Sequence, residues 1–150
     1  SIGRLDADSE GLLLFTNNNR LKTRLLDPKE GHARTYHVQV EGEVSPEQLA
    51  QLKVPMTLRI KGKSFITQGC SARIINPSWP PRTPPIRARK SVPDSWLELT
   101  LHEGKNRQVR RMTAAVGLPT LRLIRVAMGD WELGELGTGE WKELTNNPTP

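Results

Sequence analysis

The residues best suited to chemistry lie near the start of the chain, in residues 3–11, where Asp6, Asp8 and Glu10 alternate before a glycine. This pattern is similar to the opening of a calcium-binding loop. Such a loop also needs an acidic bidentate ligand at its twelfth position, where this chain has Asn17. A polar loop that precedes a strand would give the same pattern. A third use is catalysis, because a carboxylate can act as a nucleophile or a general base without a metal.

Metal or cofactor chemistry has little support elsewhere in the sequence. His32, His37, His102 and the single cysteine, Cys70, are scattered along the chain, and they form no spacing typical of a metal site. We therefore expect no metal and no cofactor. One cysteine cannot form an internal disulfide, which fits the reducing cytoplasm. The longest aliphatic and aromatic run spans residues 12–15, whereas a membrane span needs roughly 20 residues, so we expect no membrane association.

The distribution of charge indicates a nucleic-acid partner. The formal net charge is +6, from 22 Lys and Arg against 16 Asp and Glu. No acidic residue occurs in residues 48–93, which hold nine basic residues, or in residues 104–129, which hold six more. If these segments share a face, they present a positive field to a polyanion. A scattered, solvated basic surface is the alternative interpretation.

Hydrophobic periodicity predicts the elements that must position these residues. Strands are expected over residues 11–16, 35–41, 56–60, 64–75, 96–101, 121–128 and 140–144. Helices are expected over residues 20–26, after the N-cap Ser45, and over residues 105–116. Strands and short helices interleave without regular βαβ periods, which predicts an α+β fold with a mixed, mostly antiparallel central sheet and flanking short helices.

The helix expected at residues 105–116 gives its arginines different surroundings. Its apolar stripe begins at Val109. With 3.6 residues per turn, Arg107 and Arg111 project away from that stripe towards solvent or phosphate. Arg110 falls about a right angle from the stripe, where an arginine can bury its stem and direct its guanidinium into a cleft.

Residues 76–94 interrupt the elements with six of the twelve prolines. We expect a long, stiff, basic loop. The residues expected to contact RNA, in this loop and elsewhere, are Arg4, Arg82, Arg87, Arg89, Lys90, Lys105, Arg107 and Arg111. Arg4 could equally support the loop that carries Asp6.

Three segments, taken together and in this order, resemble the motifs of RNA pseudouridine synthases of the RsuA family. The first runs from Gly-Arg-Leu-Asp at residues 3–6 to Thr-Asn at residues 16–17. The second spans residues 34–42, and the third spans residues 103–112 with the Val-Gly at residues 116–117. Within that family, the proline-rich stretch at residues 80–87 is similar to the large-subunit ribosomal RNA synthase E subfamily.

This resemblance implies isomerisation of a specific uridine to pseudouridine in ribosomal RNA, on the pseudouridine synthase catalytic fold. Asp6 would be the catalytic carboxylate, attacking the base or the sugar or removing a sugar proton. Tyr36 would pack on the target base and help to take the C5 proton, and Arg110 would be the ion-pair partner of Asp6. The expected substrate is a uridine in a folded stem-loop, and the expected enzyme is a monomer. Relatives carry further catalytic domain before this motif, so residues 1–150 would form an N-terminally incomplete catalytic domain.

Taken without the resemblance, the same residues leave three alternatives open. Tyr36 lies on an apolar strand face with Val38 and Val40, as a half-buried structural aromatic residue would. Basic segments and one strand aromatic would also serve a non-catalytic RNA-binding domain, which would not need Asp6. The proline-rich loop could instead be a ligand for a protein-interaction domain.

Overall fold

The central strand of the sheet is β2 (Arg34–Glu41), whose alternating side chains give the fold two different faces. It pairs antiparallel with β6 (Asp94–Leu101) on one side and with β7 (Thr120–Met128) on the other. Because successive strand residues point to opposite faces, Tyr36 and Val38 share one face while His37 lies on the other. The first is called here the helix-side face and the second the loop-side face.

The computed structural model describes residues 1–87 and 91–144. A six-stranded sheet has the order β1-β7-β2-β6-β5, with β8 also paired to β7, and β3 and β4 form a separate hairpin. All pairs are antiparallel except β1 with β7. The remaining elements are β1 (Glu10–Gly11), α1 (Asn19–Leu26), α2 (Pro46–Lys53), β3 (Thr57–Ile60), β4 (Lys63–Ile66), β5 (Ser71–Ile75), α3 (Gln108–Ala115) and β8 (Trp131–Glu132). The expected α+β fold with a mixed, mostly antiparallel sheet is confirmed.

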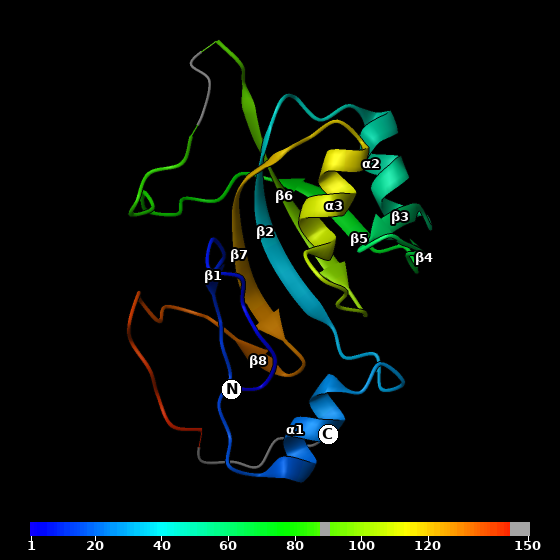
Figure 1. Cartoon of the computed structure of the whole chain (residues 1–150). Helices are drawn as coiled ribbons and strands as arrows, with labels where there is room; N and C mark the ends of the chain where they lie inside the picture. Colours follow the sequence, from blue (N-terminus) through cyan, green and yellow to red (C-terminus); the bar gives the residue numbers. More distant parts are fainter. Residues whose placement is uncertain (88–90, 145–150) are drawn as a thin grey trace.

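Helices α2 and α3 lie against the helix-side face of the sheet (Figure 1). The predicted capping box of α2 is present, because Ser45 Oγ accepts from the Gln48 backbone and the Gln48 side chain accepts from the Ser45 backbone. Met112 on α3 is fully buried against Val38 and Leu99 of the sheet. This core holds α3, and therefore its arginines, in a fixed place above the sheet.

The loop-side face is covered by the start of the proline-rich segment. Residues 76–87 and 91–93 contain no helix or strand, as the proline content predicted. Trp79 Nε1 donates to His37 Nδ1 over 2.9 Å, and His37 Nε2 lies 3.1 Å from Glu98 Oε2. The segment leaves edge strand β5, passes this face and emerges beside β1 and β7 (Figure 1). It therefore begins as an ordered part of the fold.

Three strand predictions were wrong in extent. The strand expected at residues 11–16 is only β1, because the chain leaves the sheet after Gly11 and buries Leu12 and Leu14 in a second core with α1. Residues 64–75 form two strands, separated at Gly69, whose φ of +84° and close approach to the Lys53 carbonyl oxygen favour glycine. Residues 140–144 form no strand.

Helix α3 begins at Gln108, later than the predicted residue 105. Arg107 adopts the left-handed conformation, with φ 51° and ψ 35°, which the helix cannot continue. The predicted helix at residues 20–26 is confirmed, with Asn18 capping its N-terminus. In the part of the chain that the structure describes, every helix is too short and too polar to span a membrane.

Candidate active site

The first acidic segment is held as a loop between two fixed points. Ile2 forms a β-bridge with Leu14, and Gly11 pairs with Arg125 of β7. Gly11 has φ +106°, and a Cβ there would overlap the Arg125 carbonyl oxygen. Only glycine therefore lets the chain approach β7 so closely. Between these points a turn closes, with the Ser9 N–H donating to the Asp6 carbonyl over 2.9 Å.

The carboxylates of this loop meet the start of α3. Arg107 Nη1 lies 3.3 Å from Asp6 Oδ2. The same guanidinium binds Asp8 with two hydrogen bonds, of 3.2 Å to Oδ1 and 3.0 Å to Oδ2. Hydrogen bonding from Arg107 is the main cause that lowers the pKa of Asp8 below its usual value, and the positive charge of Arg110 lowers it further. Asp8 is therefore ionised at neutral pH and holds Arg107 beside Asp6.

Arg110 approaches the same loop from deeper in the protein. Its side chain is 14% exposed, against 40% for Arg107. Its Nη2 donates to the Asp8 carbonyl over 3.1 Å and to Ser9 Oγ over 3.3 Å, and lies 3.5 Å from Asp8 Oδ1. Burial lowers the pKa of Arg110, and Asp8 acts in the opposite direction. The guanidinium stays charged and fixes the backbone that carries Asp6.

Tyr36 is brought to the same side of the sheet. It pairs with Arg125 of β7 and lies on the helix-side face, partly buried against the core. Arg125 is its cross-strand neighbour; burial lowers the pKa of that guanidinium, and the Tyr36 hydroxyl acts to raise it. The loop with Asp6, the start of α3 and the strand with Tyr36 therefore meet at one end of the helix-side face. A carboxylate, a phenol and buried guanidiniums at this place suit covalent or acid–base chemistry on an anionic substrate.

Comparison with known proteins identifies the family. Residues 1–115 match the family described as RNA pseudouridylate synthase. The chain belongs to the RNA pseudouridylate synthase family. The resemblance deduced from three motifs is thereby confirmed, and Asp6, Tyr36 and Arg110 all lie within the matched residues of this pseudouridylate synthase domain.

Individual relatives bear more specific names. The chain is 52% identical, over 99% of its length and 77% of the relative, to "Ribosomal large subunit pseudouridine synthase E" of Xanthomonas axonopodis pv. citri. It is 46% identical, over 95% of its length and 58% of the relative, to the protein of the same name in Vibrio parahaemolyticus. A solved structure titled "Crystal structure of pseudouridylate synthase" superposes with a TM-score of 0.79 at 31% identity, covering 96% of this chain and 55% of that one.

The structure gives two arginines contacts that differ from those expected. Arg107 was expected to point away from the core towards solvent or phosphate, but it precedes the helix, so a helical projection does not apply to it. Its left-handed backbone directs the side chain to the acidic loop instead. Among the described residues, the ion pair of Asp6 is with Arg107, and the direct pair expected with Arg110 is replaced by contacts to Asp8 and Ser9.

The other residues expected to contact RNA have different surroundings. Arg4 and Arg87 are exposed, and Lys105 is exposed with its ammonium 4.9 Å from the Phe65 ring centroid. Arg111 is held by the Asn106 side chain and backbone and by the Arg59 carbonyl. Arg82 donates to the Asp8 carbonyl over 3.3 Å, which brings the proline-rich loop to the acidic loop. Arg89 and Lys90 lie outside the described residues.

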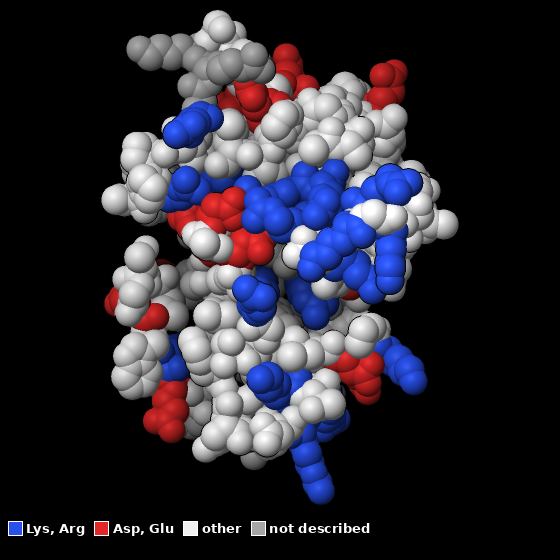
Figure 2. Space-filling view, in the orientation of Figure 1, with Lys and Arg blue, Asp and Glu red and all other residues white. Residues whose placement is uncertain are grey.

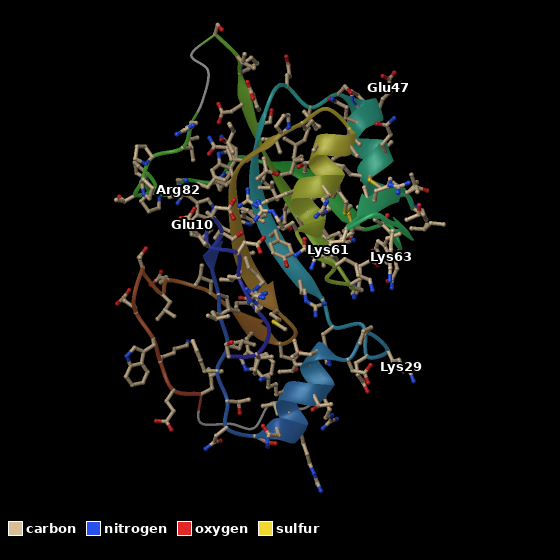
Figure 3. All side chains as sticks on the ribbon, in the orientation of Figure 1. Glu10, Lys29, Glu47, Lys61, Lys63 and Arg82 are labelled. Carbon is tan, nitrogen blue, oxygen red and sulfur yellow. The ribbon has the colours of Figure 1, made fainter. Side chains whose placement is uncertain are left out.

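Sequence reasoning missed two buried arginines in β7. Arg122 forms a bidentate ion pair with Glu10, with distances of 2.7 and 2.8 Å, and donates to the Pro80 carbonyl over 2.7 Å. Figure 3 labels Glu10 at this junction, and Arg82 of the same proline-rich segment as Pro80. Arg125 lies on the opposite face of the same strand. The available signal was two charged residues inside the strand predicted at residues 121–128, because a charge that becomes buried there needs a partner.

Proposed function

We propose that this chain carries the catalytic machinery that isomerises a uridine to pseudouridine in ribosomal RNA of the large subunit. The observation that supports this most is the placement of Asp6, which lies 3.3 Å from Arg107 in a loop fixed by Gly11 and Arg110. The names of the relatives support the choice of RNA. We further propose that residues 1–150 act as one catalytic domain within a cytoplasmic, monomeric enzyme.

Asp6 is the catalytic residue in this proposal. In the reaction the bond from ribose C1′ to N1 of uracil breaks, the base rotates, and C1′ bonds to C5. The proton leaves C5 and N1 gains one, so no redox change occurs and no cofactor is required. A carboxylate can serve as nucleophile or as general base in such a reaction. Within the described residues, no three His, Cys, Asp or Glu side chains form a metal cluster, and we expect turnover to survive EDTA.

Arg107 and Arg110 are expected to contribute to turnover to different extents. Arg107 is 40% exposed, so solvent screens its charge. Arg110 is 14% exposed, so its interactions act in a lower dielectric. We expect Arg110→Ala to lower turnover at saturating RNA by roughly 10²-fold, and Arg107→Ala by roughly tenfold. Single-turnover rates would contradict this ranking if Arg107→Ala were the more damaging change, or if the matched helix variant Arg111→Ala lost as much as Arg110→Ala.

RNA reaches the site across a basic surface. Figure 2 shows Lys and Arg gathered over α3 and the β3–β4 hairpin, next to the acidic loop. Lys61 and Lys63 come from that hairpin, at its tip beside α3 (Figure 3), and Arg111 binds the hairpin backbone at Arg59. The target nucleotide in a stem-loop must flip out at a cost of a few kcal/mol. Phosphate contacts along this surface offset that cost.

The proline-rich loop contributes a second set of contacts. Trp79 fixes its start against His37, and Arg82 reaches the Asp8 carbonyl, so the loop meets the acidic loop beside the substrate. In this proposal the basic residues of the loop bind RNA next to the flipped uridine and help to select the site. The ordered start of the loop lowers the entropy lost when it binds.

Neutralising this loop should reduce the salt dependence of RNA binding. We expect a variant with Arg82, Arg87, Arg89 and Lys90 all changed to Gln to bind a ribosomal RNA fragment more weakly, with a slope reduced by up to ~4 phosphate contacts. Affinity across a salt series measures this. The matched control changes four exposed basic residues in or near α1 to Gln, namely Arg20, Lys22, Arg24 and Lys29. If the logarithm of affinity fell equally steeply with the logarithm of salt concentration for the two variants, the loop would not be part of the RNA interface.

The proposed activity is tested by tritium release. Ribosomal RNA of the large subunit, labelled with tritium at C5 of uridine, is incubated with the protein, and pseudouridine is located by mass spectrometry of the digested RNA. We expect tritium release in proportion to pseudouridine formed at one position. RNA binding without tritium release would favour a non-catalytic RNA-binding domain.

A further inference from the structure

Arg125 is a buried charge that the functions proposed above leave unused. Its side chain lies in β7 and the residue is 4% exposed. In the part of the chain that the structure describes, no carboxylate lies within ion-pair distance of its guanidinium, and the neighbouring charge is another cation, Arg34. An unpaired buried cation is costly. Arg122, three residues earlier in the same strand, is paired with Glu10, so of these two buried arginines only Arg125 has no acidic partner among the described residues.

The guanidinium of Arg125 instead joins two parts of the site. Its Nε donates to the Leu12 carbonyl over 2.9 Å, directly after the loop that carries Asp6. It also lies beside Tyr36, its cross-strand partner on the helix-side face. Burial lowers the pKa of Arg125, while the Tyr36 hydroxyl acts in the opposite direction. Among the described residues, its Nη2 is buried without any hydrogen-bond partner.

We propose that Arg125 is a positioning residue for proton removal from C5, acting through Tyr36. Its contact with Leu12 holds the guanidinium between the acidic loop and Tyr36, and its charge stabilises negative charge on the phenol oxygen. The unfilled donor provides a further hydrogen bond when that oxygen is anionic, because an oxyanion accepts more and stronger hydrogen bonds than a phenol. This inference rests on the proposed pseudouridine synthase function.

The proton transfer balances as follows. After C1′ has bonded to C5, the Tyr36 oxyanion takes the C5 proton and becomes a phenol. The electrons of the C5–H bond form the C5=C6 bond, the former C6=N1 electrons move to N1, and N1 takes a proton from solvent. Tyr36 then returns its proton to solvent. Arg125 exchanges no proton and stays cationic throughout.

Uridine and 5-fluorouridine separate this role from a structural one. Fluorine replaces the C5 hydrogen, so consumption of 5-fluorouridine reports cleavage of the bond to C1′ without loss of a C5 proton. Single-turnover rates are measured for RNA carrying either base at the target position. We expect Arg125→Met to slow pseudouridine formation from uridine by roughly tenfold to a hundredfold, yet to slow 5-fluorouridine consumption by less than about threefold. Tyr36→Phe should show the same selectivity, and Arg125→Lys should recover part of the uridine rate.

Arg122→Met is the matched control, because it removes a buried arginine from the other face of the same strand. We expect this variant to lower the single-turnover rates with uridine and with 5-fluorouridine by the same factor. Equal slowing of both bases by an Arg125→Met protein that melts cooperatively would overturn the inference. If Arg125→Met does not melt cooperatively, the same comparison of uridine and 5-fluorouridine rates is made with Arg125→Lys, and equal slowing of the two reactions would overturn the inference. A wild-type protein that converts neither base would overturn the proposed function itself. If the wild type is active but Arg125→Met slows the reactions of both bases equally, only the role of Arg125 is overturned.

Discussion

Exchange of Asp6 for Asn is expected to reduce pseudouridine formation by roughly 10⁴-fold or more. The amide keeps the shape of the side chain but has neither the negative charge nor the basicity of a carboxylate. The proposed chemistry needs one of these properties, whether Asp6 attacks a carbon or removes a proton. Arg107, which lies 3.3 Å from Asp6, keeps its two hydrogen bonds to Asp8, so the loop should remain in place.

Tritium release from C5-labelled RNA measures the effect, and a filter-binding assay on the same RNA measures affinity. We expect affinity within a few-fold of wild type, because Asp6 makes no positive contribution to phosphate binding. Asp130→Asn, the same exchange in an exposed turn, serves as the control and should retain full activity. Turnover by Asp6→Asn within tenfold of wild type would refute the catalytic assignment.

Introducing a single methyl group at Gly11 should be the most damaging structural change in the site. Gly11 has φ +106°, and an added Cβ would overlap the backbone of Arg125. Backbone strain of about 1–3 kcal/mol combines with an overpacking cost of about 1–3 kcal/mol. We expect Gly11→Ala to lower the free energy of unfolding by about 2–5 kcal/mol or to detach β1 from β7. Either result displaces Asp6, so catalysis should fall even where the protein remains folded.

Urea denaturation and tritium release together measure this effect. Gly62→Ala is the matched control, since Gly62 also has a positive φ, of +80°, but nothing lies within 4 Å of its added Cβ. That change should cost only about 1–2 kcal/mol and leave the single-turnover rate near wild type. If the two variants lost equal stability, the close approach of β1 to β7 would not be what holds the acidic loop.

The sequence by itself determined which side chains are candidates for catalysis and where most of the helices and strands lie. Periodicity located the strand with Tyr36, and the spacing of Ser45 and Gln48 located the capping box of α2, because both features depend on neighbours within a few residues. The order of the three motifs identified the family, which the match over residues 1–115 confirms. The proline content of residues 76–94 likewise predicted a segment without helix or strand, since proline cannot continue either.

Only the tertiary structure decided how these residues meet. Whether Arg107 or Arg110 contacts Asp6 depends on a single left-handed residue before α3, and a helical projection cannot detect it. The strand after Gly11 was overestimated because Leu12 and Leu14 are buried by a second core rather than by a sheet. The pairing of Arg125 with Tyr36 requires β2 and β7 to be neighbours. Contacts across such large sequence separations are set by packing of the whole fold, which no local pattern records.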